Sequence, residues 1–181
     1  MHKTAASREV DKMSNFADVL SYAEKHSLTE KAAVYEPAFR NFIRSLKIKT
    51  AVEIGTYRGV TAAFMAEQAE KIYTFDIKDY PEKRTLWQKT GTDNKIVFAK
   101  INTISDIKDF LSGITFDFCF IDGPGTAKEL SAAFKIARAG GRVLFHNSGP
   151  KEKYKVVREY VTTLDVTPVG TQSLYWTGEP K

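Results

Sequence analysis

A short apolar strand that runs through a glycine turn into a helix constrains the fold of this chain more than any other stretch. Residues 51–54 are apolar except for Glu53, and Gly55 and Gly59 follow them, four residues apart. Residues 60–66 then show the apolar pattern of a buried helix. A buried strand that passes directly into a helix predicts the first unit of an α/β sheet.

The turn in this unit is suited to a small ligand. Gly55 can adopt a positive φ and has no Cβ, so a ligand can lie against the main chain, and Gly59 lets the helix start close to the strand. The free N–H groups near Val60 and Thr61 favour a negatively charged group, whereas Glu53 favours a positive or hydrogen-bond-donating one. A nucleotide-like ligand with both an amino group and a carboxylate fits better than a diphosphate. The alternative is a turn that binds nothing.

A second acidic residue strengthens the ligand interpretation. Residues 72–77 are predicted to form a strand that carries Asp76 near its end, about 20 residues beyond the glycine turn, as a βαβ unit requires. At the tip of the second parallel strand, a carboxylate can accept hydrogen bonds from both ribose hydroxyls of an adenosine. Asp76 as a helix cap or turn residue is the alternative.

The acidic-x-Gly-x-x-x-Gly pattern of residues 53–59 resembles motif I of the class I methyltransferases that use S-adenosylmethionine. The dinucleotide-binding fingerprint is Gly-x-Gly-x-x-Gly, and this turn has Thr56 and Tyr57 where its second glycine should stand. In the family, the loop after the third strand contacts the adenine ring. The resemblance implies that the cofactor is S-adenosylmethionine and that these residues bind it: Glu53, Gly55, Thr56, Tyr57, Gly59, Thr61, Asp76, Ile77, Thr103, Ser105 and Asp122.

The remaining patterns predict a doubly wound α/β fold with a mostly parallel, Rossmann-like sheet and a C-terminal antiparallel hairpin. The further strands are expected at residues 95–101, 114–121 and 142–145, and the hairpin at 166–169 and 172–176. Helices are expected at residues 16–26, about 126–139 and about 153–164.

Before the first strand, a second helix is expected from an N-cap at Thr29 to Leu46, with Pro37 as a kink or a break. Residues 1–12 are expected to form a mobile arm or a poorly anchored first turn. A loop with a short helix is expected at residues 79–91. We expect a single domain over residues 1–181, with an N-terminal helical segment at 1–48 and the α/β core at 49–181.

Polar residues at the ends of the fourth and fifth strands are the candidates for chemistry. Asp122, His146 and Asn147 resemble the metal site of the divalent-metal-dependent O-methyltransferases of the catechol and caffeoyl-coenzyme A type, which have an aspartate where this chain has His146. That family also carries a lysine base where this chain has Gly125.

Three interpretations of this group stay open. Imidazole in place of carboxylate favours a softer ion than magnesium, such as manganese, iron or zinc, at Asp122, His146 and Asn147. Without a metal, His146 can act as the general base, with Asp122 orienting it. The third interpretation is a purely structural turn.

Composition and charge indicate which classes of partner and which cellular compartment to expect. The chain of 181 residues carries a net charge of +5, but its lysines are scattered. The densest basic group mixes with Glu152 and Glu159 on a predicted helix and consists of Lys151, Lys153, Lys155 and Arg158. One cysteine, Cys119, lies in an apolar run. The chain has no apolar stretch of membrane-spanning length and no signal-peptide pattern, so we expect a cytoplasmic protein.

These observations predict an S-adenosylmethionine-dependent methyltransferase that acts on a small molecule, most simply at oxygen. A non-catalytic binding module of the same fold and an RNA-modifying methyltransferase are the alternatives. The sequence identifies neither the methyl acceptor nor the oligomeric state.

Overall fold

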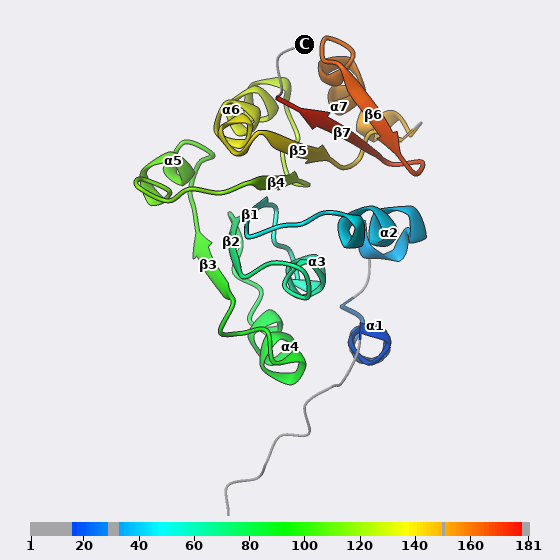
Figure 1. The fold of residues 1–181 in the computed structure, drawn as a ribbon, viewed down its shortest axis with the longest axis vertical. Coiled ribbons are helices and arrows are strands. Elements are labelled where there is room, and N and C mark those ends of the chain that lie inside the picture. Colours follow the sequence, from blue (N-terminus) through cyan, green and yellow to red (C-terminus); the bar gives the residue numbers. More distant parts are fainter. Residues whose placement is uncertain (1–15, 29–32, 150, 179–181) are drawn as a thin grey trace, which may run out of the picture.

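A seven-stranded mixed sheet forms the centre of the protein in the computed structural model, which describes residues 16–28, 33–149 and 151–178 (Figure 1). Its strand order is β3-β2-β1-β4-β5-β7-β6. The first five strands pair in parallel, β7 lies antiparallel to β5, and β6 lies antiparallel to β7. The strands are β1 (Thr50–Ile54), β2 (Lys71–Asp76), β3 (Ile96–Lys100), β4 (Phe118–Ile121), β5 (Arg142–Phe145), β6 (Val166–Val169) and β7 (Ser173–Thr177). This sheet confirms the predicted fold class.

Helices cover both faces of the sheet. They are α1 (Phe16–Lys25), α2 (Pro37–Ser45), α3 (Val60–Met65), α4 (Glu82–Thr90), α5 (Asp106–Phe110), α6 (Ala127–Ala137) and α7 (Lys155–Val161), with 3-10 turns η1 (Ala33–Tyr35), η2 (Arg138–Gly140) and η3 (Glu152–Tyr154). Helices α1 to α4 pack against one face, and α5 to α7 against the other (Figure 1).

Alternation along β4 supplies side chains to both cores. Phe118 and Phe120 pack with the helices of the first face, whereas Cys119 and Ile121 pack with those of the second. All four residues are buried, as expected of a central parallel strand. This strand is shorter than the predicted stretch 114–121, because Asp117 turns its carboxylate to the backbone N–H of Thr50 at 2.9 Å and to Arg142.

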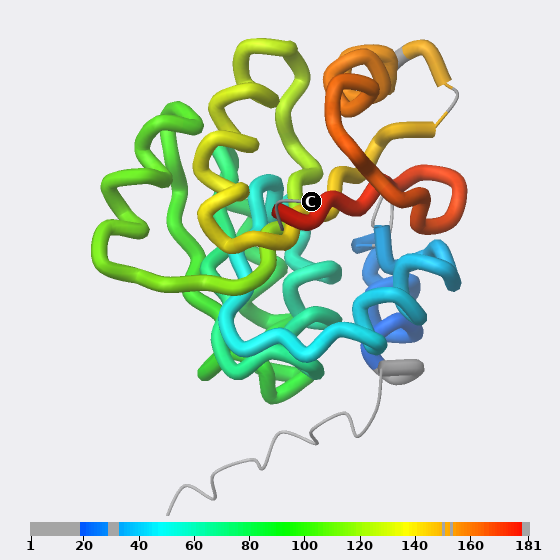
Figure 2. Tube along the Cα trace, turned by 45° about the horizontal axis from the view of Figure 1, so that its top comes forward, coloured from blue at the N-terminus to red at the C-terminus, as the bar shows by residue number. Residues whose placement is uncertain are grey.

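The N-terminal helices join the first core. The predicted division at Pro37 is found: η1 ends before it, and α2 begins at Pro37 itself, where the missing N–H costs no helical hydrogen bond. The expected cap at Thr29 and the arm at residues 1–12 lie outside the described residues. Figure 2 shows the blue N-terminal helices beside the red C-terminal hairpin, where the Thr171 hydroxyl donates to Glu36 at 2.9 Å.

Helix α6 starts where the sequence indicates. The Thr126 hydroxyl accepts a hydrogen bond from the Glu129 N–H at 3.2 Å, and the Glu129 carboxylate accepts the Thr126 N–H at 3.0 Å, which is a complete capping box. None of the helices in the described part of the chain combines the length and apolar character needed to cross a bilayer.

Candidate functional site

A cleft of about 470 Å³ opens at the carboxyl ends of the parallel strands. Its walls come from segments that follow β1, β2, β3, β4 and β5, which the strand order brings to one edge of the sheet. Six of the predicted cofactor residues line it: Gly55, Tyr57, Asp76, Ile77, Thr103 and Asp122.

The two glycines of the β1–α3 turn are required by packing. Gly55 has a φ of 107°, and a Cβ there would lie 2.5 Å from the carbonyl oxygen of Asp122. Gly59 has a φ of 76°, and a Cβ there would lie 2.8 Å from Lys83 and Trp87 on α4. The Trp87 indole N–H also donates to the Gly59 carbonyl at 2.9 Å. The turn therefore joins β4 and α4 to the floor of the cleft.

Glu53 lies beneath this turn and does not line the cleft. Its side chain is fully buried and accepts a hydrogen bond from the Thr74 hydroxyl, which in turn accepts one from the Thr56 hydroxyl at 2.6 Å. The other carboxylate oxygen, Oε1, has no hydrogen-bond partner among the described residues. Burial raises the pKa of Glu53 well above its usual range, against the Thr74 bond. Gly59, Thr56 and Thr61 line a separate small hollow of about 20 Å³ beside the cleft.

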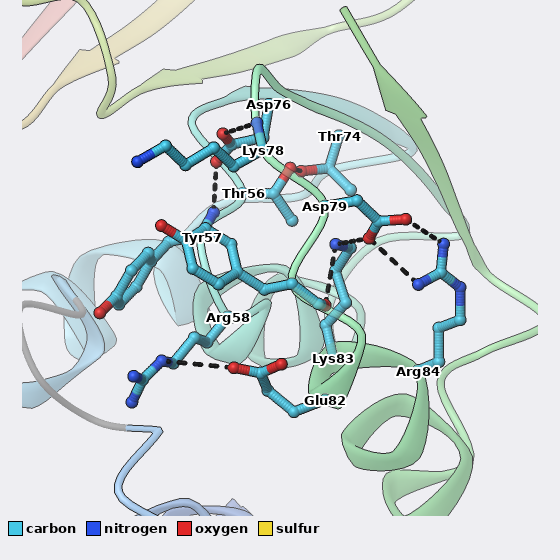
Figure 3. Close-up of polar contacts among 11 residues, drawn as sticks. Thr56, Tyr57, Arg58, Thr74, Asp76, Lys78, Asp79, Glu82, Lys83 and Arg84 are labelled. Atoms are coloured by element: carbon cyan, nitrogen blue, oxygen red, sulfur yellow. Dashed lines mark hydrogen bonds and ion pairs between the residues drawn. The ribbon is translucent and has the colours of Figure 1, made fainter.

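Asp76 is held rigidly at the end of β2. Its carboxylate accepts the backbone N–H of Tyr57 at 2.7 Å and that of Lys78 at 2.9 Å (Figure 3). The first of these bonds joins the β1 turn to the β2 tip. Ile77, the next residue, lines the cleft and is 58% exposed.

The loop after β3 reaches the cleft through Asn102, Thr103 and Ile104. Asp106 orders it by accepting the N–H groups of Asn102 and Thr103 at 2.8 and 3.0 Å and the Thr103 hydroxyl at 2.9 Å. These bonds hold the pKa of Asp106 below its usual range. Ser105 precedes α5 without a side-chain cap bond and is not among the described residues that line the cleft.

Asp122 and Asn147 form a pair at the ends of β4 and β5. The Asn147 side-chain amide donates to Asp122 Oδ1 at 2.6 Å, and both residues line the cleft. Asn147 has a φ of 60°, a left-handed conformation that asparagine tolerates better than most residues. Burial raises the pKa of Asp122 well above its usual range, and the bond from Asn147 opposes that shift.

His146 lies apart from this pair. Its Nδ1 is 3.0 Å from the Ser173 hydroxyl, its ring centroid is 6.1 Å from that of Phe120, and it does not line the cleft. Burial lowers the pKa of His146 to about 4, with nearby Glu36 opposing the shift. The structure therefore brings Asp122 and Asn147 together at the cleft. The His146 imidazole points away from them, toward Ser173.

This arrangement does not fit the proposed metal site. Asp122 and Asn147 are bonded to each other, and His146 is engaged with Ser173. Within the described residues, no group of three or more histidine, cysteine, aspartate or glutamate side chains could hold a metal ion. Of the three predicted ligands, the structure therefore places only one carboxylate and one amide together at the cleft.

The sequence analysis missed several residues that line the cleft: Lys78, Tyr80, Asn102, Gly123, Pro124, Glu129 and Tyr154. Lys78 and Tyr80 follow Asp76 closely, so their proximity could have been inferred from its position. The Tyr80 ring packs edge-on against Tyr57 with centroids 5.0 Å apart. Tyr154 reaches the cleft from η3, and no local sequence signal marks it.

Comparisons with known proteins agree with this architecture. A family model described as a methyltransferase domain matches residues 52–148, more than half of the chain. No curated protein shows a significant match in sequence.

Solved structures match over nearly the whole chain. An O-methyltransferase from Bacillus cereus in complex with SAH has a TM-score of 0.69 and 15% identity, covering 94% of this chain and 93% of its own. The O-methyltransferase TomG from Streptomyces achromogenes in complex with SAM has a TM-score of 0.66 and 17% identity, covering 96% and 94%. The SAH-bound methyltransferase PaMTH1 from Podospora anserina has a TM-score of 0.66 and 16% identity, covering 88% and 86%. Because the sequence identities are 15–17%, the similarity to these structures establishes the fold of this chain.

Proposed function

Because the chain belongs to the family of methyltransferase domains, we propose that it transfers a methyl group from S-adenosylmethionine to an oxygen atom of a small molecule. The cofactor and the O-methyl chemistry are supported by the neighbours of the same fold, which include O-methyltransferases solved with SAM or SAH. The observation that carries the proposal is the pairing of Asp76 and Asp122 in one cleft, each at the end of a parallel strand.

Asp76 is suited to the nucleoside half of the cofactor. Each of its oxygens accepts one backbone N–H, and each keeps a lone pair that can accept a ribose hydroxyl. Because Tyr57 and Lys78 supply those N–H groups, the carboxylate is oriented before the ligand arrives. Thr103 and Ile77 also line the cleft, and we assign them to the adenine side. We place Glu53, Thr56, Thr61 and Ser105 around the site as supporting residues that do not line it.

S-adenosylmethionine, when bound, supplies a sulfonium methyl that is already activated for transfer. The protein must therefore orient the acceptor oxygen and remove its proton. Asp122 is the group we assign to proton removal, because it lines the cleft and its raised pKa makes it a stronger base than an ordinary carboxylate. Asn147 holds Asp122 in place. His146, which does not line the cleft, is assigned a structural role instead.

The test is transfer of labelled methyl groups from S-adenosylmethionine to a panel of small hydroxylated aromatic compounds, with and without a chelator. We expect transfer that survives chelation and falls by about a hundredfold in Asp122→Asn. Asp93→Asn, which changes an exposed carboxylate of the same kind, is the matched control and should retain activity. Transfer that requires an added metal contradicts the assignment to Asp122, and cofactor binding without transfer to any acceptor favours the non-catalytic module.

We also propose that residues 1–181 form one domain located in the cytoplasm. The single domain is supported by packing of Phe39 from α2 against Phe64 and Phe120, at centroid distances of 6.3 and 5.2 Å. The compartment is supported by Cys119, a single buried thiol with no cysteine partner in the chain.

A further inference from the structure

A lysine is buried beneath the wall of the cleft. Lys83 lies on α4 with no solvent exposure, on the same helix face as Leu86 and Trp87. Burying a charged group is costly unless its hydrogen bonds are made inside the protein, and an apolar side chain of similar size is often equally stable at such a place. The partners of Lys83 therefore indicate what its charge does.

The Lys83 ammonium binds the loop that follows β2. Its Nζ donates to the Asp79 carboxylate and to the Tyr80 carbonyl, the latter at 3.0 Å (Figure 3). The same nitrogen lies 3.8 Å from the centroid of the Phe98 ring, which belongs to β3. The cation is thus fully engaged, and its two oxygen partners are successive residues of one loop.

Asp79 lies between this buried cation and an exposed one. Arg84 donates to both Asp79 oxygens, at 3.0 and 2.6 Å, from a side chain that is 53% exposed. Hydrogen bonds from Arg84 and Lys83 lower the pKa of Asp79 to about 2. Both cations bind the Asp79 carboxylate, but of the two only Lys83 also donates a hydrogen bond to the Tyr80 carbonyl.

The loop held by Lys83 forms part of the cleft. Ile77, Lys78 and Tyr80 line it, and the Tyr80 ring packs against Tyr57 from the glycine turn. On its other side, the Cβ of Lys83 lies against Gly59, 2.8 Å from where a Cβ on that glycine would be. One side chain therefore contacts both the loop after β2 and the turn after β1.

We propose that Lys83 is a positioning residue for the nucleoside half of the cofactor cleft, an inference that rests on the proposed function. Its ammonium fixes two successive residues of that loop, through the Asp79 carboxylate and the Tyr80 carbonyl, and thereby sets the distance between the loop after β2 and the β1 turn. A methionine at this position keeps the length and apolar contacts of the side chain but loses both hydrogen bonds to the loop. The wall then shifts although the helix still packs.

The test compares Lys83→Met with Arg84→Met, since each removes one cation paired with Asp79. S-adenosylhomocysteine and adenosine are titrated by calorimetry well below the melting temperature of each variant. We expect Lys83→Met to weaken binding of both ligands by the same factor, about tenfold, and Arg84→Met by less than about threefold. A merely structural role lowers the melting temperature but leaves the affinity of the folded protein unchanged. Equal affinities of Lys83→Met and the unmodified protein overturn the proposal.

Asp79→Ala covers the case in which Lys83→Met does not fold, because Asp79 is partly exposed. It removes the carboxylate from both cations, so its affinity loss should exceed that of Arg84→Met by about threefold or more. Equal losses in these two variants overturn the proposal. If the unmodified protein binds neither ligand, the proposed function itself fails and this inference fails with it.

Discussion

The side-chain amide of Asn147 donates a 2.6 Å hydrogen bond to Asp122, and it does so from a left-handed backbone conformation with a φ of 60°. That conformation turns the chain sharply after β5 and places the two adjacent side chains of residues 146 and 147 in different surroundings. Asn147 lines the cleft, whereas the His146 ring contacts the Ser173 hydroxyl.

Replacing Asn147 by glycine and by alanine separates the amide from the backbone. Both variants leave Asp122 without its partner, so we expect methyl transfer to fall by about tenfold in each. Only alanine also carries the cost of a left-handed backbone, roughly 1 kcal/mol, which thermal unfolding should reveal as a lower melting temperature than that of the glycine variant. Full activity in the glycine variant would show that Asp122 needs no positioning by Asn147.

Gly55→Ala should destabilise the protein strongly. The new methyl group would overlap the Asp122 carbonyl oxygen at 2.5 Å, in a backbone with a φ of 107°, so we expect a loss of about 2–4 kcal/mol in the free energy of unfolding. Gly113→Ala is the control: its φ is 77°, but nothing lies within 4 Å of the new atom. Urea denaturation of both variants measures the difference, and equal losses would mean that the contact with Asp122 is unimportant.

The burial of His146 should make stability depend on pH. The pKa of His146 is lowered to about 4 in the folded protein, below about 6.5 in the unfolded chain. Between these two pKa values, the unfolded chain binds more protons at residue 146 than the folded protein does. The contribution of neutral His146 to the free energy of unfolding is therefore complete above about pH 6.5 and is lost as the pH falls toward 4. Glu36, which faces His146, opposes the shift but does not cancel it.

His146→Asn checks this dependence, because its amide can still bond with Ser173 but does not titrate. From about pH 7 to about pH 4.5, the unmodified protein should lose roughly 2 kcal/mol more unfolding free energy than the variant. Parallel pH profiles of the two proteins would show that His146 titrates normally in the folded state.

Much of the fold could be predicted because its signals are local. Mostly apolar runs that adjoin a glycine or an acidic residue marked β1, β2 and β5, and the carboxyl ends of parallel strands share one edge. The meeting of Asp76 and Asp122 in one cleft follows from that geometry. The break between η1 and α2 at Pro37 could also be predicted, since proline has no N–H to donate within a helix.

Two features of the site could not be predicted from local sequence patterns. Whether His146 or Asn147 faces the cleft depends on the backbone conformation of a single residue, for which the sequence carries no periodic signal. On α4, Lys83 occupies an interior position in the i, i+3, i+4 pattern with Leu86 and Trp87, but its charge conceals the apolar face. Its burial is explained by hydrogen bonds to Asp79 and Tyr80, four and three residues before it, and by contact with the Phe98 ring of β3.

The most direct test of the central claim is calorimetric titration of the unmodified protein with S-adenosylhomocysteine, with a nicotinamide dinucleotide as the control ligand. We predict micromolar binding of S-adenosylhomocysteine, no binding of the dinucleotide, and a loss of affinity of at least about tenfold in Asp76→Ala but not in Asp93→Ala. Absence of S-adenosylhomocysteine binding, or binding that Asp76→Ala leaves unchanged, would contradict the assignment of this cleft to the methyl donor.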